Sequence, residues 1–199
     1  MSNVAVFLDR DGVINRNWYN PATSEWESPL RPEDFELFDG VIPSLTRISD
    51  AGFRLFLVSN QPSAAKGKCS LDDLHRVERK LSTILATARV SFDASYYSYT
   101  HPQGVVPELT GDFPGRKPDP YFLEQAIAQF GLVRERCWMV GDRPTDVECG
   151  RRARVRTIKV RSTEGKEEVE REKPDFYAED LAAATLIILA PAAASPSSR

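Results

Sequence analysis

The chain has 199 residues, of which 41% are hydrophobic and 28% are charged, a composition typical of one globular domain. The formal net charge of −3 argues against a nucleic acid as the main partner, because a phosphodiester backbone usually demands a basic face. We expect a single domain over residues 1–190 and a disordered Ala/Pro/Ser-rich tail over residues 191–199.

The cysteines and the first residues favour the cytoplasm. Cys69, Cys137 and Cys149 are far apart and odd in number, so free thiols are favoured over a disulfide framework or a zinc site. The first apolar run ends at Asp9 and is too short for a signal peptide or a membrane span. We therefore expect a cytoplasmic monomer that contacts neither membranes nor nucleic acid.

In the N-terminal half, apolar runs and helical spacing alternate. Residues 4–8 form a continuous apolar run, which predicts a strand buried on both faces. An irregular stretch rich in proline and aromatic residues follows over residues 15–39. Helical spacing then predicts a helix over residues 41–51, and a second buried strand is expected over residues 53–58. Ser70 is the expected N-cap of a long amphipathic helix.

The C-terminal half continues this alternation. Residues 92–99 predict a third strand, and a Gly/Pro-rich loop follows over residues 101–118. The remaining elements are expected to be a helix over 119–131, a strand over 137–140, a helix over 145–153, a strand over 155–160, a short strand near Phe176 and a helix over 181–189.

Alternating strands and helices predict an α/β fold with three layers, in which helices cover both faces of a mostly parallel, doubly wound sheet. In such folds, ligands bind beyond the carboxyl ends of the strands. The residues that directly follow each apolar run are therefore the candidates for chemistry.

The first strand is followed by Asp9, Arg10 and Asp11. Because side chains alternate along a strand, we expect Asp9 and Asp11 to project to one side and Arg10 to the other. Two carboxylates held that close resist joint ionisation unless a cation separates them or one keeps its proton. Taken alone, the same residues would also fit a solvated turn.

The second strand ends in the hydroxyl of Ser59, and the amide side chains of Asn60 and Gln61 follow. The loop before the 119–131 helix supplies the basic pair Arg116 and Lys117. Each group has an ordinary alternative, because Ser-Asn is common in helix caps and basic pairs are common on surfaces.

The 137–140 strand is followed by Asp142, and Asp146 lies four residues further on, within helical reach. Acidic residues at a helix start are often explained by the helix dipole alone. Each of these groups has an ordinary explanation when it is taken alone. Their occurrence together, with carboxylates, a hydroxyl, a lysine and a further carboxylate at four separate strand ends, is harder to explain without a shared function.

This order of residues resembles that of the haloacid dehalogenase (HAD) superfamily, and the resemblance to its phosphatases extends from residue 4 to about residue 160. Within the superfamily, the chain looks most like the heptose-bisphosphate and histidinol-phosphate phosphatases. The stretches that carry this resemblance are FLDRDGVIN (7–15), FDGV (38–41), SNQP (59–62), KGK (66–68), HPQG (101–104) and RKP (116–118).

The resemblance implies a HAD-like Rossmannoid fold with a minimal loop cap, and an aspartyl-phosphate mechanism. Asp9 would be the nucleophile, and Asp11 would be the acid that protonates the leaving group and the base that activates water. Mg²⁺ would be held by Asp9, Asp142 and the backbone carbonyl of Asp11, with Asp146 nearby.

The remaining implied roles concern the phosphate and the substrate. A phosphate dianion and two ionised aspartates together carry a charge of about −4, and Mg²⁺ contributes about +2. Lys117 would reduce the negative charge that remains at the site. Ser59 is the further catalytic residue, a neutral donor to the phosphate oxygens. The expected substrate-binding residues are Asn15, Asn60, Gln61, Arg116 and Arg143.

The chain departs from these families at two places. Many relatives bind a structural zinc through cysteine and histidine pairs, but the corresponding positions here are Ser98, Thr100, Phe113 and Gly115, so we expect no structural zinc. The segment over residues 17–32 is longer than in the relatives compared, and it either closes over the pocket or pads the sheet edge.

The expected activity is hydrolysis of a small sugar phosphate, specifically the 7-phosphate of D-glycero-D-manno-heptose 1,7-bisphosphate. Histidinol phosphate is the alternative substrate, and a 3′-phosphorylated polynucleotide is disfavoured by the acidic balance of the chain. Two non-enzymatic alternatives are disfavoured. A phosphate-binding scaffold would ordinarily have lost Asp9, Asp11 or Lys117, and a phospho-accepting receiver domain would lack the second carboxylate after the nucleophile and the GDRPTD segment over residues 141–146.

Overall fold

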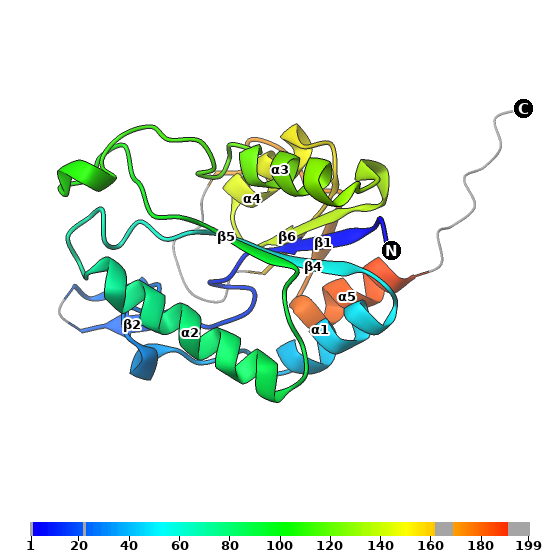
Figure 1. Cartoon of the computed structure of the whole chain (residues 1–199), viewed down its shortest axis with the longest axis horizontal. Coiled ribbons are helices and arrows are strands. Elements are labelled where there is room, and N and C mark those ends of the chain that lie inside the picture. The colour runs from blue at the N-terminus through cyan, green and yellow to red at the C-terminus, as the bar shows by residue number, and fades with distance from the viewer. Residues whose placement is uncertain (1, 22, 162–168, 191–199) are drawn as a thin grey trace, which may run out of the picture.

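The computed structural model describes residues 2–21, 23–161 and 169–190, so the predicted tail over 191–199 lies outside the described residues. A six-stranded parallel sheet forms the centre of the protein (Figure 1), with strand order β5-β4-β1-β6-β7-β8. Its strands are β1 (Ala5–Leu8), β4 (Arg54–Asn60), β5 (Ala94–Ser98), β6 (Trp138–Gly141), β7 (Arg156–Val160) and β8 (Phe176–Ala178). The predicted α/β class and the short strand near Phe176 are confirmed.

Helices cover both faces of the sheet (Figure 1). One face carries α1 (Val41–Asp50), α2 (Leu71–Thr87) and α5 (Leu181–Leu189), and the other carries α3 (Tyr121–Phe130) and α4 (Pro144–Arg152). The alternation of side chains in β1 explains the two layers, because Val6 and Leu8 belong to the first core whereas Ala5 and Phe7 belong to the second. A strand buried on both faces must be apolar throughout, as β1 is.

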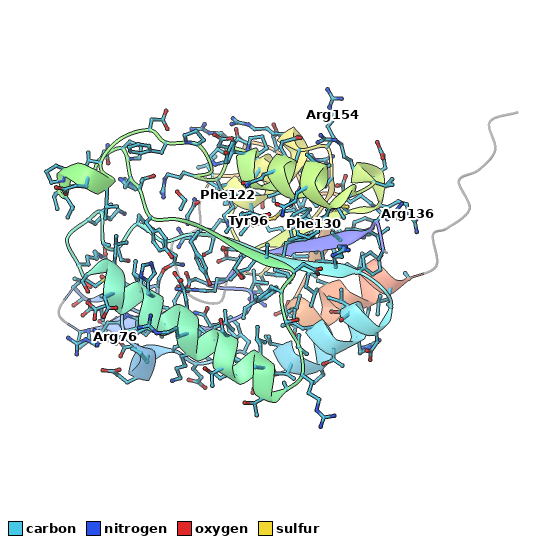
Figure 2. All side chains as sticks on the ribbon, viewed as in Figure 1. Arg76, Tyr96, Phe122, Phe130, Arg136 and Arg154 are labelled. Atoms are coloured by element: carbon cyan, nitrogen blue, oxygen red, sulfur yellow. The ribbon has the colours of Figure 1, made fainter. Side chains whose placement is uncertain are left out.

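Aromatic side chains fill the second core on the side of α3 (Figure 2). Tyr96 of β5 stacks on Phe122 of α3, with ring centroids 5.1 Å apart. Phe130, near the end of α3, meets the ring of Phe56 edge-on at 5.0 Å. These contacts fix α3 over the β4–β5 side of the sheet, and the loop that precedes α3 is thereby brought to the strand ends.

The order of the strands creates the crevice that binds ligands in doubly wound folds. From β1 the chain moves outward to β4 and β5, and it then returns to β6 on the opposite side of β1. The connections after β1, β4 and β6 therefore leave the sheet side by side, at the switch point where the direction of winding reverses.

Two stretches predicted to be irregular contain short elements. Within residues 15–39, β2 (Trp18–Asn20) and β3 (Glu25–Glu27) form an antiparallel hairpin, and a 3₁₀ turn, η1, covers Pro32–Asp34. Two more 3₁₀ turns are η2 (Pro107–Leu109) and η3 (Arg134–Arg136). Strand β4 also runs two residues further than predicted.

None of the helices in the described part of the chain has the length and apolarity that a bilayer crossing requires.

Candidate active site

A cavity of about 350 Å³ lies at the carboxyl end of β1. Its walls come from the segments after β1, β4 and β6, from the loop before α3 and from the β2–β3 hairpin. The predicted site residues that line it are Asp9, Asp11, Asn60, Arg116, Lys117 and Arg143. Segments far apart in the sequence therefore meet at one cavity, as the rule for parallel sheets predicts.

Lys117 is a buried cation of the site, with 3% of its surface exposed. Its Nζ lies 2.7 Å from Asp9 Oδ1 and 2.6 Å from Asp146 Oδ1, and it donates to the carbonyl of Val58 at 2.8 Å. The side chain of Asn60 holds the Lys117 main chain through two hydrogen bonds of 3.0 Å. Burial lowers the pKa of Lys117, but the charges of Asp146 and Asp9 outweigh burial and raise it, so this side chain stays charged.

Three buried carboxylates, those of Asp9, Asp142 and Asp146, place oxygen atoms within 4.8 Å of one another. Burial, together with the charges of Asp9 and Asp146, raises the pKa of Asp142 to about 8. Burial also raises the pKa of Asp9 to about 6, against the opposing charge of Lys117. Asp142 Oδ1 is buried and has no hydrogen-bond partner among the residues that the structure describes. A surplus of carboxylate oxygens with an unpaired acceptor fits a hard divalent cation such as Mg²⁺.

Two glycines allow this close approach of carboxylates to backbone. A Cβ atom at Gly12, where φ is +87°, would lie 2.3 Å from Asp142 Oδ2. A Cβ atom at Gly141 would lie 2.2 Å from the Cβ atom of Asp146. The other oxygen of Asp146, Oδ2, accepts a hydrogen bond of 3.0 Å from the Arg143 N–H at the start of α4. Asp146 was expected near the aspartate pair, and the structure makes it a full member of the cluster.

The expectation that Arg10 lies opposite both Asp9 and Asp11 is wrong. After β1 the backbone turns, with the Asn15 N–H donating to the Arg10 carbonyl at 3.0 Å, so strand alternation no longer applies. Arg10 is fully buried, and its Nη2 donates to the two carboxylate oxygens of Asp11 at 3.0 and 3.2 Å. Burial alone would raise the pKa of Asp11, but Arg10 and hydrogen bonds from Asn15 and Gln61 lower it below its ordinary value.

Asn15, Gln61 and Ser59 belong to the same buried network. The Asn15 amide donates to Asp11 Oδ1 at 2.9 Å, and the Gln61 amide donates to Asp11 Oδ2 and, at 2.9 Å, to Ser59 Oγ. Asn15 and Gln61 therefore hold Asp11, Ser59 contacts Gln61, and none of these three residues is among those that line the described cavity. Their predicted contacts with substrate or phosphate, and the predicted metal contact of the Asp11 carbonyl, stay predictions.

Known proteins resemble this chain over most of its length. A family model described as HAD-hydrolase-like matches residues 115–184. The D-glycero-D-manno-heptose-1,7-bisphosphate 7-phosphatase of Chlorobaculum tepidum is 36% identical over 184 residues, which cover 88% of this chain and 89% of the relative. The chain belongs to the HAD phosphatase family.

A second relative agrees with this assignment to the HAD phosphatases, and a solved structure shares the fold. The protein of the same name from Thermosynechococcus vestitus is 36% identical over 193 residues, covering 92% of this chain and 94% of the relative. The crystal structure of D,D-heptose 1,7-bisphosphate phosphatase from B. bronchiseptica, complexed with magnesium and phosphate, shares the fold with a TM-score of 0.76. It is 21% identical and covers 94% of this chain and 98% of its own.

As a HAD phosphatase, the protein is a phosphoric monoester hydrolase. The two non-enzymatic alternatives, a scaffold and a receiver domain, are therefore wrong. The absence of a structural zinc stays a prediction. It depends on the residues at positions 98, 100, 113 and 115, where serine, threonine, phenylalanine and glycine offer no soft ligand.

The cavity of this HAD phosphatase is also lined by residues for which we predicted no role from the sequence. Lys66 and Lys68 line it, although they were noted only as part of a shared motif. The β2–β3 hairpin contributes Glu25, Trp26 and Glu27, so this part of the segment over residues 17–32 lines the pocket, and its closure over the pocket stays a prediction. Its unusual length was the only signal that could have indicated this contribution.

Proposed function

We propose that this HAD phosphatase hydrolyses the 7-phosphate of D-glycero-D-manno-heptose 1,7-bisphosphate, with Mg²⁺ as its cofactor and Asp9 as its nucleophile. The relatives from Chlorobaculum tepidum and Thermosynechococcus vestitus carry this activity in their names. We further propose that it acts as a monomer in the cytoplasm.

The observation that carries the substrate choice is a group of cations on the cavity that holds Asp9. Lys66, Arg116 and Arg143 all line this cavity. Burial, and then the charges of Lys68, Arg116 and Arg143, lower the pKa of Lys66, although Glu25 opposes them. Cations that destabilise one another in this way are stabilised by a bound anion. A second phosphate on the substrate would supply that anion.

The same cations disfavour histidinol phosphate. Away from its phosphate, that substrate carries an amino group that is protonated at neutral pH. A second positive charge beside Lys66 and Arg116 would be repelled, whereas a second phosphate would be attracted. The charge of the substrate group away from the scissile phosphate therefore favours a bisphosphate over histidinol phosphate.

In the proposed first step, an ionised oxygen of Asp9 attacks phosphorus and the bond to the sugar oxygen breaks. Lys117, 2.7 Å from Asp9 Oδ1, favours the ionised carboxylate and offsets the charge that accumulates on the phosphoryl oxygens. Mg²⁺ held by Asp9, Asp142 and the Asp11 carbonyl would supply further positive charge to the same oxygens when bound.

Asp11 is the proposed proton carrier. It gives a proton to the departing sugar oxygen, and it then takes a proton from the water that hydrolyses the aspartyl phosphate. In the structure Arg10, Asn15 and Gln61 favour its ionised form. A phosphate dianion bound nearby would raise the pKa of Asp11, so substrate binding itself would help to load the proton.

A phosphate-release panel with Mg²⁺ tests the proposal. We expect kcat/KM for the heptose bisphosphate to exceed that for histidinol phosphate, heptose monophosphates and a 3′-phosphorylated oligonucleotide by at least about 100-fold. Asp9→Asn should fold normally and release no phosphate. A preference for histidinol phosphate would refute the substrate assignment, and an active Asp9→Asn variant would refute the nucleophile.

A further inference from the structure

The β2–β3 hairpin places a buried carboxylate on the wall of the cavity. Trp18 pairs with Glu27, Tyr19 with Trp26, and Asn20 with Glu25. Glu27 is 8% exposed, whereas Tyr19 and Trp26 are about half exposed, at 48% and 49%. Residues opposite each other in an antiparallel pair share a face, so the Trp18–Glu27 face is turned toward the protein.

By hydrogen-bond distance and angle, the two oxygens of the Glu27 carboxylate differ in their partners among the described residues. Glu27 Oε1 accepts hydrogen bonds from Thr23 Oγ1 at 2.7 Å and from Lys68 Nζ at 2.8 Å. Glu27 Oε2 is buried and has no hydrogen-bond partner among the described residues. Burial alone would raise the pKa of Glu27, but hydrogen bonds from Lys68, Thr23 and Asn20 lower it, so the side chain is ionised. A buried ionised oxygen without a donor is a strong acceptor for a ligand.

The chemistry of this oxygen restricts the ligand group that can meet it. A phosphate would be repelled by Glu27, although the cavity wall also carries Lys66, Arg116 and Arg143, which attract phosphate. A hydroxyl group can donate to the carboxylate without adding a charge. Trp18 Nε1, a buried donor with no hydrogen-bond partner in the described part of the chain, comes from the residue opposite Glu27 in the hairpin. A hydroxyl can both donate and accept a hydrogen bond, whereas an ammonium group can only donate.

We propose that Glu27 is a specificity-determining residue, whose Oε2 accepts a hydrogen bond from a hydroxyl on the carbon chain of the substrate. This inference rests on the proposed function, since it assumes a phosphorylated polyol in the cavity. The cations select the phosphates, and Glu27 selects a hydroxylated chain between them. Lys68 has a positioning role, because its ion pair holds Oε1 of a residue that lines the cavity.

The test compares two bisphosphates that differ in their hydroxyl groups. Heptose 1,7-bisphosphate is measured beside heptane-1,7-diol bisphosphate, which has both phosphates and no free hydroxyl. Glu27→Gln should lower kcat/KM for the sugar bisphosphate by about 10- to 100-fold, the effect of losing a hydrogen bond to a charged group. It should leave the alkyl bisphosphate unchanged or improve it, so the ratio of the two kcat/KM values falls at least tenfold.

Two further variants separate recognition from structure. Glu27→Asp keeps the charge but withdraws the carboxylate by one methylene, and it should also lower the ratio. Glu33→Gln makes the same change of charge at an exposed glutamate that does not line the cavity, and it should leave the ratio within about twofold of the wild type. Circular dichroism and thermal unfolding check that each variant is folded.

The outcomes are distinguishable. An equal fall for both bisphosphates in Glu27→Gln would show a merely structural role and would overturn this inference alone. An unchanged ratio in both Glu27 variants would do the same. If the wild-type protein released no phosphate from the sugar bisphosphate, the proposed function would be overturned and this inference with it.

Discussion

Asp142→Asn should make the metal-free protein more stable while it abolishes activity. Asparagine has the shape of aspartate without its charge. The pKa of Asp142 rises from an ordinary 3.8 to about 8, because burial and the charges of Asp9 and Asp146 oppose ionisation. At high pH without a metal ion, the folded wild-type protein therefore holds a carboxylate that its surroundings disfavour.

The magnitude follows from linkage. A group whose pKa is higher in the folded state stabilises the fold at low pH, and that stabilisation is lost as pH rises through the folded pKa. For Asp142 the loss occurs between about pH 4 and pH 8. Each pKa unit corresponds to about 1.4 kcal/mol, which bounds the effect at roughly 6 kcal/mol. We expect about 2–4 kcal/mol at pH 9, because the wild-type site relaxes and admits water.

Urea unfolding in EDTA, followed by tryptophan fluorescence, measures this difference. The advantage of Asp142→Asn should be large at pH 9 and smaller at pH 5, and Mg²⁺ should stabilise only the wild type. Asp39→Asn, at a fully exposed carboxylate, is the control and should change little at either pH. A variant less stable than the wild type at pH 9, or a difference independent of pH, would refute the reasoning.

Three other substitutions test separate parts of the structure. Gly12→Ala should lower the free energy of unfolding by more than about 1 kcal/mol and remove phosphatase activity, because φ is positive and the new Cβ would clash with Asp142; normal activity would contradict this. Arg10→Met should destabilise by about 3–5 kcal/mol in urea unfolding, because the buried Asp11 carboxylate loses its cation; a change below about 1 kcal/mol would argue against that pairing. Ser70→Ala should lower the free energy of unfolding by about 1 kcal/mol through loss of the α2 capping box, and kcat/KM should not change. An altered kcat/KM would show that the substitution also perturbs the active site.

The fold was predictable because its strong signals are local. The run over residues 4–8 is apolar at every position, and only a strand covered on both faces requires this. Gly131 was the expected helix end, and it adopts the left-handed conformation, with φ of 60°, that ends α3. Because ligands bind beyond the carboxyl ends of parallel strands, we could predict that Asp9, Lys117 and Asp142 lie close together without knowing any distance between them.

The remaining features depend on geometry that no local pattern contains. The contact between Arg10 and Asp11 arises because β1 ends at Leu8 and the backbone then turns. The alternation of side chains along a strand therefore does not extend to these two residues. The hairpin strands have three residues each, too few for a periodic signal. Glu27 is held by Lys68, a partner 41 residues away in the sequence, and such a pair cannot be read from either segment alone.

The hairpin has a consequence for how this enzyme can diverge. Among the described residues it forms a two-stranded sheet of its own and adds no strand to the central six. Residues can therefore be inserted or deleted between β2 and β3 without shifting the register of β1, on which Asp9 depends. Natural selection can alter the preferred substrate at the hairpin while the phosphoryl-transfer apparatus is inherited intact.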